Sequence, residues 1–171
     1  MERGGAILSY HTHVLLALMT LLNIKLLPVV DSFSSSPVFL IERAAYPLFG
    51  VNGYGVHVNG WVRQPDADRP THLWIGTRAK TKSTWPGMLD HIVAGAQPYG
   101  ISPSENVVKE CAEEANIPLE IARRAKSVGA VSYMGLDEKG LLKRDSLFCF
   151  DLELPVTFLI NWKNENPSLS L

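Results

Sequence analysis

Three glutamates, Glu110, Glu113 and Glu114, have the spacing that brings carboxylates together on one side of a helix. Like charges at this spacing repel, at a cost of about 0.2–0.5 kcal/mol per pair, so a bound cation would offset a real penalty. Hard divalent cations prefer carboxylate and carbonyl oxygens as ligands. The triplet therefore predicts a Mg²⁺ or Mn²⁺ site, and the alternative is an acidic face exposed to solvent.

The segment that carries these glutamates has the start and stop signals of a helix. Ser102 is an N-cap residue, Pro103 takes the first helical position and Glu105 completes a capping box. Asn116 and Pro118 are expected to end the helix. The acidic side lies opposite an apolar side, which the helical period predicts to contain Val108, Cys111, Ala112 and Ala115.

Short runs of strand-like sequence surround this helix. Their apolar and alternating patterns predict strands over Gly53–Val62, Leu73–Thr77, Ile92–Ala94, Val128–Met134 and Leu147–Leu152. Asp137–Gly140 has the composition of a turn and separates the last two strands. This order of elements predicts an α+β fold, with helices packed on a mixed sheet.

The overall composition is that of one globular domain. The 171 residues are 46% hydrophobic and 19% charged, and 16 basic residues against 17 acidic ones leave a net charge of −1. No broad basic surface is available to hold a nucleic-acid backbone, so no nucleic-acid partner is expected. Two cysteines, Cys111 and Cys149, are too few for a disulfide scaffold, which favours a reducing compartment.

The N-terminal region is unusually apolar from Ala6 to Val30. Asn23, Lys25 and Pro28 interrupt it before it reaches the roughly 20 apolar residues that a membrane span requires, so we expect no membrane insertion. Its scarcity of acidic residues loosely suggests an organellar leader, and the alternative is a remnant of an upstream segment. Ser34–Pro37 has the composition of a linker.

The predicted helix and the loop before it resemble the Nudix box of the Nudix hydrolases. That signature is a Gly, five residues, a Glu, seven residues, Arg-Glu, an apolar residue, any residue, Glu-Glu, any residue, a Gly and an apolar residue. From Gly95 to Ile117 every spacing fits without a gap. Ile101 replaces the first Glu, Lys109 replaces the Arg and Asn116 replaces the last Gly, while the three later glutamates are intact.

The resemblance implies roles for individual residues. Box glutamates and a backbone carbonyl, which maps to Ala94 or Gly95, would hold divalent ions, so the expected metal ligands are Glu110, Glu113, Glu114 and Gly95. Glu110 and Glu114 are the expected catalytic residues, and Glu110 is also a candidate for the base that takes a proton from water. Glu138 is an alternative base on a later loop.

Basic and aromatic residues ahead of the box could contact the substrate. Arg78, Lys80 and Lys82 are expected to bind a terminal phosphate, and the alternative is a solvated basic loop. His57 could touch a heterocycle or serve as a structural hydrogen-bonding residue, and Trp85 could stack on a ring or cover the core. Cys111 is expected to be buried rather than nucleophilic.

Further segments are similar to the Nudix subfamily related to thiamine pyrophosphokinase, which includes the plant chloroplast Nudix hydrolases. They are Ile41–Ala45, Tyr54–Gly60, Lys80–Asp90 and Lys143–Asp145. The resemblance implies a Nudix fold, in which helices sandwich a mixed β-sheet (α/β/α). It also implies hydrolysis of thiamine diphosphate or damaged analogues to the monophosphate and phosphate. The expected partner is thus a small diphosphate, in the chloroplast or the cytoplasm.

The extent of this resemblance suggests a division of the chain. Residues 1–36 would be the apolar leader or the remnant of an upstream segment, 37–155 the Nudix domain, and 156–171 a tail unlike the family. Because the tail does not resemble the strand and helix that usually complete the fold, the domain is expected to be incomplete at its C-terminal end.

Three functions are compatible with these observations. The first is a metal-dependent pyrophosphohydrolase. The second is a catalytically inactive Nudix-fold fragment that only binds. The third is an isomerase of an allylic diphosphate, which would need a catalytic cysteine in a loop, where Cys111 does not lie.

Overall fold

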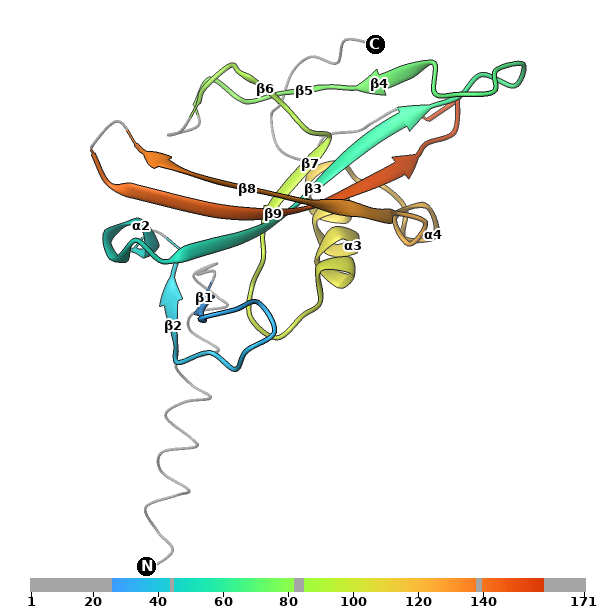
Figure 1. Cartoon of the computed structure of the whole chain (residues 1–171). Helices are drawn as coiled ribbons and strands as arrows, with labels where there is room; N and C mark the ends of the chain where they lie inside the picture. Colours follow the sequence, from blue (N-terminus) through green and yellow to red (C-terminus); the bar gives the residue numbers. More distant parts are fainter. Residues whose placement is uncertain (1–25, 44, 82–84, 138–139, 159–171) are drawn as a thin grey trace, which may run out of the picture.

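The computed structural model describes residues 26–43, 45–81, 85–137 and 140–158. The helices in these ranges are α2 (Tyr46–Phe49), α3 (Pro103–Glu114) and α4 (Leu119–Ala122). The strands are β1 (Leu26–Val29), β2 (Phe39–Glu42), β3 (Asn52–Val62), β4 (His72–Trp74), β5 (Gly76–Thr77), β6 (Leu89–Asp90), β7 (Val93–Ala96), β8 (Lys126–Leu136) and β9 (Leu142–Glu153) (Figure 1).

The main sheet is mixed and is built around β3. Its order is β4-β3-β9-β8, and β7 also pairs with β3. β3 and β9 are parallel from the pair Asn52–Arg144 to the pair Trp61–Glu153, whereas β4 and β7 are antiparallel to β3. The predicted α+β fold with a mixed sheet is confirmed.

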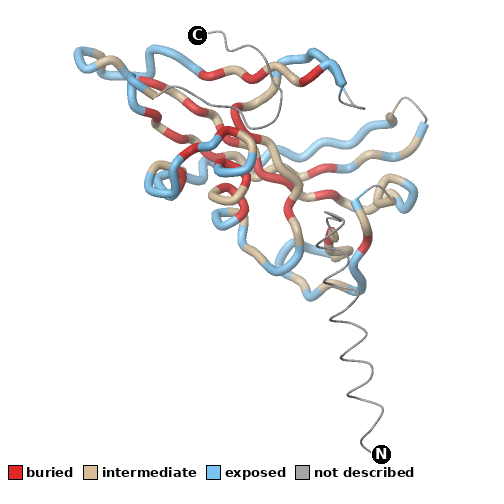
Figure 2. The backbone as a smooth tube through the Cα atoms, turned by 180° about the vertical axis from the view of Figure 1, so that it is seen from behind, coloured by how far each residue is buried: buried red, intermediate tan, exposed pale blue. Residues whose placement is uncertain are grey.

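The alternation along β3 decides which side chains enter the core. Val56, Val58 and Val62 are buried and belong to one apolar cluster with α3 residues such as Val107 and Cys111. α3 and α4 lie on this face, which we call the helix face (Figure 1). The buried residues lie along the central strands and α3 (Figure 2).

The intervening residues of β3 point to the opposite side of the sheet. We call this side the His57 face, and it comprises His57, Asn59 and Trp61 of β3 together with Asp145 and Asp151 of β9, which pair with β3 in register. The short helix α2 contributes Tyr46 to this face, where its hydroxyl donates a hydrogen bond of 3.1 Å to Asp145.

Helix α3 begins as the sequence predicts. Ser102 and Glu105 form a reciprocal capping box and Pro103 occupies the first turn. At the other end Asn116 has φ 51°, the left-handed conformation in which asparagine can replace glycine. The predicted apolar side is wrong at Ala112, which is exposed. Val107 is buried instead, because α3 is rotated so that its 107–111–115 line faces the sheet.

The predicted strands differ in their limits from those of the structure, and the strand expected at Leu147–Leu152 begins earlier, at Leu142 of β9. The expected strand Leu73–Thr77 is interrupted at Ile75, because β4 pairs with β3 whereas β5 pairs with β6 in a separate two-stranded sheet. The strand expected at Ile92–Ala94 is β7, shifted to Val93–Ala96. The turn expected after Asp137 is confirmed by a hydrogen bond from Gly140 N–H to its carbonyl.

The linker predicted at Ser34–Pro37 is instead part of the connection in a β-hairpin. β1 and β2 pair antiparallel, so residues on both sides of the expected boundary at residue 36 belong to one unit. Phe33 in this connection packs against Tyr54 and Phe148, with ring centroids 5.0 and 4.6 Å apart. The hairpin therefore packs on the main sheet.

Strand β8 leaves apolar surface in contact with solvent. All residues of β8 are exposed, among them Val128, Val131 and Met134. Phe158, which lies in the expected tail, packs against the core cluster. Of the helices in the described ranges, none is long and apolar enough to cross a membrane.

Candidate metal and diphosphate site

The acidic end of α3 packs against the edge of β7. Glu110 is only 2% exposed and its carboxylate lies against Gly95, where a Cβ atom would come within 2.8 Å of Oε1. Glu114 accepts a hydrogen bond of 3.0 Å from the backbone amide of Ala94. Two of the three predicted glutamates are thus brought to the glycine-containing strand at the start of the box.

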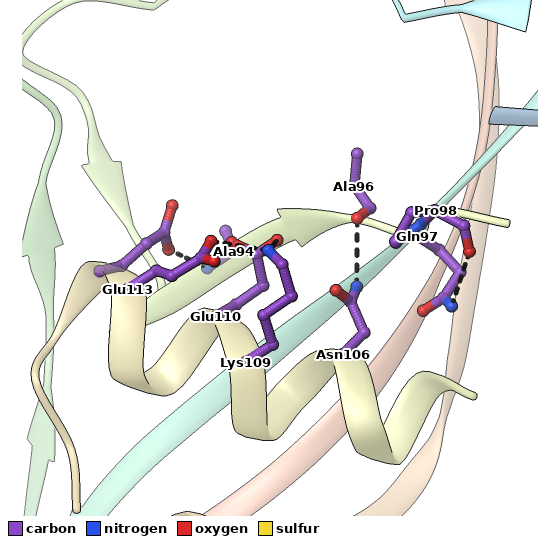
Figure 3. A network of polar contacts seen from close by, with 9 residues as sticks. Ala94, Ala96, Gln97, Pro98, Asn106, Lys109, Glu110 and Glu113 are labelled. Carbon is purple, nitrogen blue, oxygen red and sulfur yellow. Dashed lines mark hydrogen bonds and ion pairs between the residues drawn. The ribbon is translucent and has the colours of Figure 1, made fainter. Parts of the chain in front are cut away.

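Glu113 has a different environment. Its side chain is about half exposed, and its Oε2 lies 2.6 Å from Nζ of Lys109. The same ammonium lies 3.2 Å from Oε1 of Glu110, so Lys109 bridges the two carboxylates (Figure 3). The residue that replaces the box Arg therefore neutralises part of the acidic cluster from within the helix.

The electrostatics of Lys109 follow from these contacts. Burial lowers the pKa of its ammonium, but the hydrogen bond to Glu113 and the negative charge of Glu110 outweigh this effect and raise the pKa above its usual value. Lys109 is consequently positively charged throughout the physiological pH range and occupies the place of a cation between two carboxylates.

The loop between β7 and α3 is held by two buried amide side chains that the sequence analysis did not single out. Asn106 donates a hydrogen bond of 3.1 Å to the carbonyl of Ala96 (Figure 3). Gln97 donates one of 2.6 Å to the carbonyl of Ile101. Both residues are at most 2% exposed. In the sequence, the one sign of this role is that Asn106 is a polar residue next to the apolar Val107, near the capped start of the helix.

The hairpin β1–β2 also contacts this loop. The amide of Tyr99 donates a hydrogen bond of 3.3 Å to the carbonyl of Leu26 in β1. The amide of Gln97 bonds to Tyr54 in β3 at 2.8 Å, so the loop is attached at two points to strands outside the box. These contacts fix the backbone that faces the carboxylates.

The predicted phosphate-binding residues differ in their surroundings. Arg78 forms an ion pair of 2.7 Å with Asp90 across the β5–β6 hairpin, which compensates its charge. Lys80 is exposed on the loop that follows β5. Lys82 and the alternative base Glu138 lie outside the described residues.

The other candidate residues, Trp85, His57 and Cys111, contact side chains of the protein itself. Trp85, at φ 48°, lies over Lys143, whose Nζ is 4.0 Å from the ring centroid. His57 lies on the sheet with its ring 4.3 Å from that of His91. Cys111 is buried, and burial together with the charges of Glu114 and Glu110 raises the pKa of its thiol to about 12, which rules out a thiolate nucleophile at neutral pH.

The donor set suits a hard divalent cation. Carboxylate oxygens of Glu110 and Glu114 lie beside the backbone of Ala94 and Gly95, and Gly95 has no side chain where the Glu110 carboxylate packs. Within the described ranges, however, no three His, Cys, Asp or Glu side chains are already gathered as a metal site. Glu113 accepts a hydrogen bond from Lys109 instead of joining the other two glutamates, which agrees with this finding.

The amino-acid sequence is similar to two plant proteins. The chain is 56% identical over 135 residues to Nudix hydrolase 20, chloroplastic, from Arabidopsis thaliana, and 54% identical over 135 residues to Nudix hydrolase 24, chloroplastic, from the same plant. Each match covers 79% of this chain but only 35% and 36% of the relatives, so the chain spans about a third of their length. No family model matches the chain.

A solved structure agrees with this likeness at the level of the fold. The MutT protein from Methanosarcina mazei superposes with a TM-score of 0.53 at 18% sequence identity, over 70% of this chain and 75% of that one. The chain thus has the Nudix fold, and its similarity to the two plant proteins supports its placement in the Nudix hydrolase family.

Proposed function

We propose that this chain is a metal-dependent pyrophosphohydrolase that cleaves a small diphosphate into a monophosphate and phosphate. The observation that carries the proposal is the position of the α3 carboxylates. Glu110 packs against Gly95 and Glu114 is tied to the amide of Ala94, so an acidic patch lies beside a glycine-containing strand. The likeness to plant Nudix hydrolases over 79% of the chain supports the same activity.

In this proposal Glu110, Glu113 and Glu114, with the carbonyl of Gly95, hold Mg²⁺ or Mn²⁺. When bound, the ion supplies positive charge that neutralises phosphate oxygens and acidifies the attacking water. The amide of Ala94 orients Glu114, and Asn106 holds the neighbouring carbonyl of Ala96 in place. Glu113 joins the ligand set when it exchanges the ammonium of Lys109 for the ion.

Glu110 is the residue best placed to accept the proton of the attacking water. Its carboxylate is buried next to the strand, and a base in such a position stays oriented without a large entropic cost. Oε1 of this carboxylate lies 3.2 Å from the ammonium of Lys109. Glu138, the other candidate, lies outside the described residues.

The proposed substrate is thiamine diphosphate or a damaged analogue. The support is the resemblance of four segments outside the box to the subfamily related to thiamine pyrophosphokinase, and the subfamily's plant members are chloroplast enzymes. Arg78, Lys80 and Lys82 would contact the terminal phosphate, with Arg78 anchored by Asp90. The names of the two Arabidopsis relatives support a chloroplast location.

A second candidate function is binding without turnover, and the bridge formed by Lys109 favours it. If that ammonium is not displaced, it takes the place of the catalytic ion between Glu110 and Glu113, so a bound diphosphate would not be cleaved. The isomerase is disfavoured, because it needs a reactive cysteine whereas Cys111 is buried with a raised pKa.

The deciding experiment is phosphate release from thiamine diphosphate by the full chain, with and without Mg²⁺. We expect release only with the metal, and Glu114→Gln should lower kcat/KM by about 100-fold or more, the scale of a lost acid–base or metal-positioning group. The amide oxygen of Gln still accepts the Ala94 hydrogen bond, which preserves the fold. Glu120→Gln, on the exposed surface of α4, is the matched control. Folded protein without turnover at any Mg²⁺ concentration would support the binding function instead.

A further inference from the structure

A chain of polar contacts crosses the His57 face next to β7. Nδ2 of Asn59 donates a hydrogen bond of 2.9 Å to Oδ1 of Asp151, and Oδ1 of Asn59 lies 2.9 Å from Nδ1 of His91. The ring of His57 lies against the ring of His91, with centroids 4.3 Å apart and planes at 45°. The contacts join β3 and β9 to the segment between β6 and β7.

These contacts fix the tautomer of His91. An ionised carboxylate only accepts hydrogen bonds, so Asp151 requires the NH₂ group of Asn59 to face it. The carbonyl oxygen of Asn59 then faces His91, and this oxygen can only accept as well. Nδ1 of His91 must therefore carry the hydrogen, which leaves Nε2 of the neutral imidazole as a hydrogen-bond acceptor.

The chain of contacts lies close to the proposed diphosphate site. His57 is the Cα partner of Ala94 in the β3–β7 ladder, and the amide of Ala94 binds Glu114. Cα partners in a ladder carry their side chains on the same face, so Ala94 faces the His57 side while Gly95 faces Glu110, and a ring attached to a diphosphate held at this backbone can extend past β7 towards the histidine pair. Burial and the neighbouring His91 lower the pKa of His57 to about 4, so this ring is uncharged at neutral pH.

We propose that His91 is a specificity-determining residue, whose Nε2 accepts a hydrogen bond from an N–H group on the heterocyclic ring of the substrate. Asn59 and Asp151 are positioning residues that hold His91 in the accepting tautomer. The inference rests on the proposed function for the place of the diphosphate. It assigns the substrate class more closely, as diphosphates whose ring carries a hydrogen-bond donor.

A purely structural role for the same contacts makes a different prediction. If Asn59 and Asp151 only connect the strands by hydrogen bonds, their replacement lowers the stability of the fold and changes kcat/KM by the same factor for all diphosphates. Selection through His91 instead changes the ratio between two substrates that differ in one N–H group. This ratio separates the two roles.

The first test is nuclear magnetic resonance of the full chain with ¹⁵N-labelled histidine at about pH 8. We expect His91 to carry its hydrogen on Nδ1 in the wild type, and to lose this preference in Asn59→Leu. Asn52→Leu is the matched control, since Asn52 lies on the same strand and donates to Ser146 of β9 at 3.1 Å. A hydrogen on Nε2 of wild-type His91 would overturn the inference.

The second test adds ligand together with Mg²⁺, with each diphosphate carrying a methylene bridge in place of its anhydride oxygen, so that the metal site is filled and no turnover occurs. Thiamine diphosphate, whose pyrimidine carries an amino group, should shift the Nε2 resonance of His91, and the analogue without that amino group should not. Equal shifts with both ligands, or none with either, would contradict the proposed contact. This measurement does not depend on hydrolysis.

The third test is the ratio of kcat/KM for the two diphosphates without the methylene bridge, with Mg²⁺. We expect the wild type and Asn52→Leu to prefer the amino compound by about three- to tenfold, the value of one neutral hydrogen bond, and Asn59→Leu to lose the preference. Hydrolysis without any preference would refute the inference and leave the proposed function intact. A ligand-dependent His91 shift without hydrolysis would do the reverse.

Discussion

The ammonium of Lys109 lies 2.6 Å from the carboxylate of Glu113, one helical turn further along α3. The same ammonium contacts Glu110, so a single side chain offsets the repulsion that three neighbouring glutamates create. Any metal that uses Glu113 has to compete with this ion pair. The proposed site is therefore one in which an internal cation and a divalent ion exclude each other.

The first prediction concerns this competition. Lys109→Met should lower the Mg²⁺ concentration needed for half-maximal phosphate release by about two- to fivefold, since an exposed ion pair contributes about 0.2–1 kcal/mol. Methionine retains an aliphatic stem, so the helix should persist. A Mg²⁺ titration of activity measures the effect, and Lys126→Met on exposed β8 is the control. A higher Mg²⁺ requirement in Lys109→Met would show that Lys109 supports metal binding.

The second prediction concerns Gly95. Gly95→Ala places a Cβ against the Glu110 carboxylate, 2.8 Å from Oε1, so either the strand or the glutamate has to move. We expect a loss of about 1–3 kcal/mol in the free energy of unfolding and a large loss of activity. Urea unfolding and phosphate release measure the two effects. At Gly135 the added Cβ meets no atom within 4 Å, and Gly135→Ala should leave both unchanged.

The third prediction concerns the pH dependence of stability. Burial and the charge of His91 lower the pKa of His57 from 6.5 to about 4, although Asp90 and Asp145 partly oppose this shift. Below pH 6.5 the unfolded state binds the proton more readily, so the stability that His57 contributes is present above pH 6.5 and is lost as the pH falls towards 4.

We expect this loss to be about 1–2 kcal/mol, allowing for the partial exposure of the ring. Urea unfolding at several pH values between 4 and 7.5 measures it. His57→Asn should flatten the curve in this window, whereas the same substitution at exposed His72 should not. An unchanged slope in His57→Asn would mean that another group causes the pH dependence.

The fourth prediction tests whether the β1–β2 hairpin belongs to the domain. Phe33→Ala removes ring contacts with Tyr54 and Phe148 and should lower the free energy of unfolding by about 1–2 kcal/mol. Phe39, a similarly exposed ring in β2, offers the control variant Phe39→Ala. Equal unfolding curves for Phe33→Ala and the wild type would agree with a domain that starts after residue 36.

Local signals in the sequence predict the fold where they are independent of distant contacts. The capping box at Ser102 and Glu105 predicts the start of α3 because both partners lie within one turn. The alternation of Val56, His57 and Val58 predicts β3 because the period of a strand is two residues. The interruption at Ile75 could not be predicted, since it depends on which strands β4 and β5 pair with.

The candidate site was predictable in its residue types but not in its arrangement. Helical spacing groups the three glutamates on one side, yet the structure buries Glu110, ties Glu114 to Ala94 and leaves Glu113 with Lys109. The difference arises from the way α3 packs against β7, which the spacing of the glutamates along the helix does not specify. Gln97 and Asn106 were missed because their partners are backbone carbonyls of a loop.

The parallel pairing of β3 with β9 has a consequence for the order in which the molecule assembles. Partners such as Asn59 and Asp151 are separated by 92 residues, and closing so long a segment is entropically slow. During synthesis β3 stays without this neighbour until the ribosome has released β9. The acidic helix is therefore made after β3 and β7, on which it packs, but before β8 and β9, and the sheet around it is completed only when β9 pairs with β3.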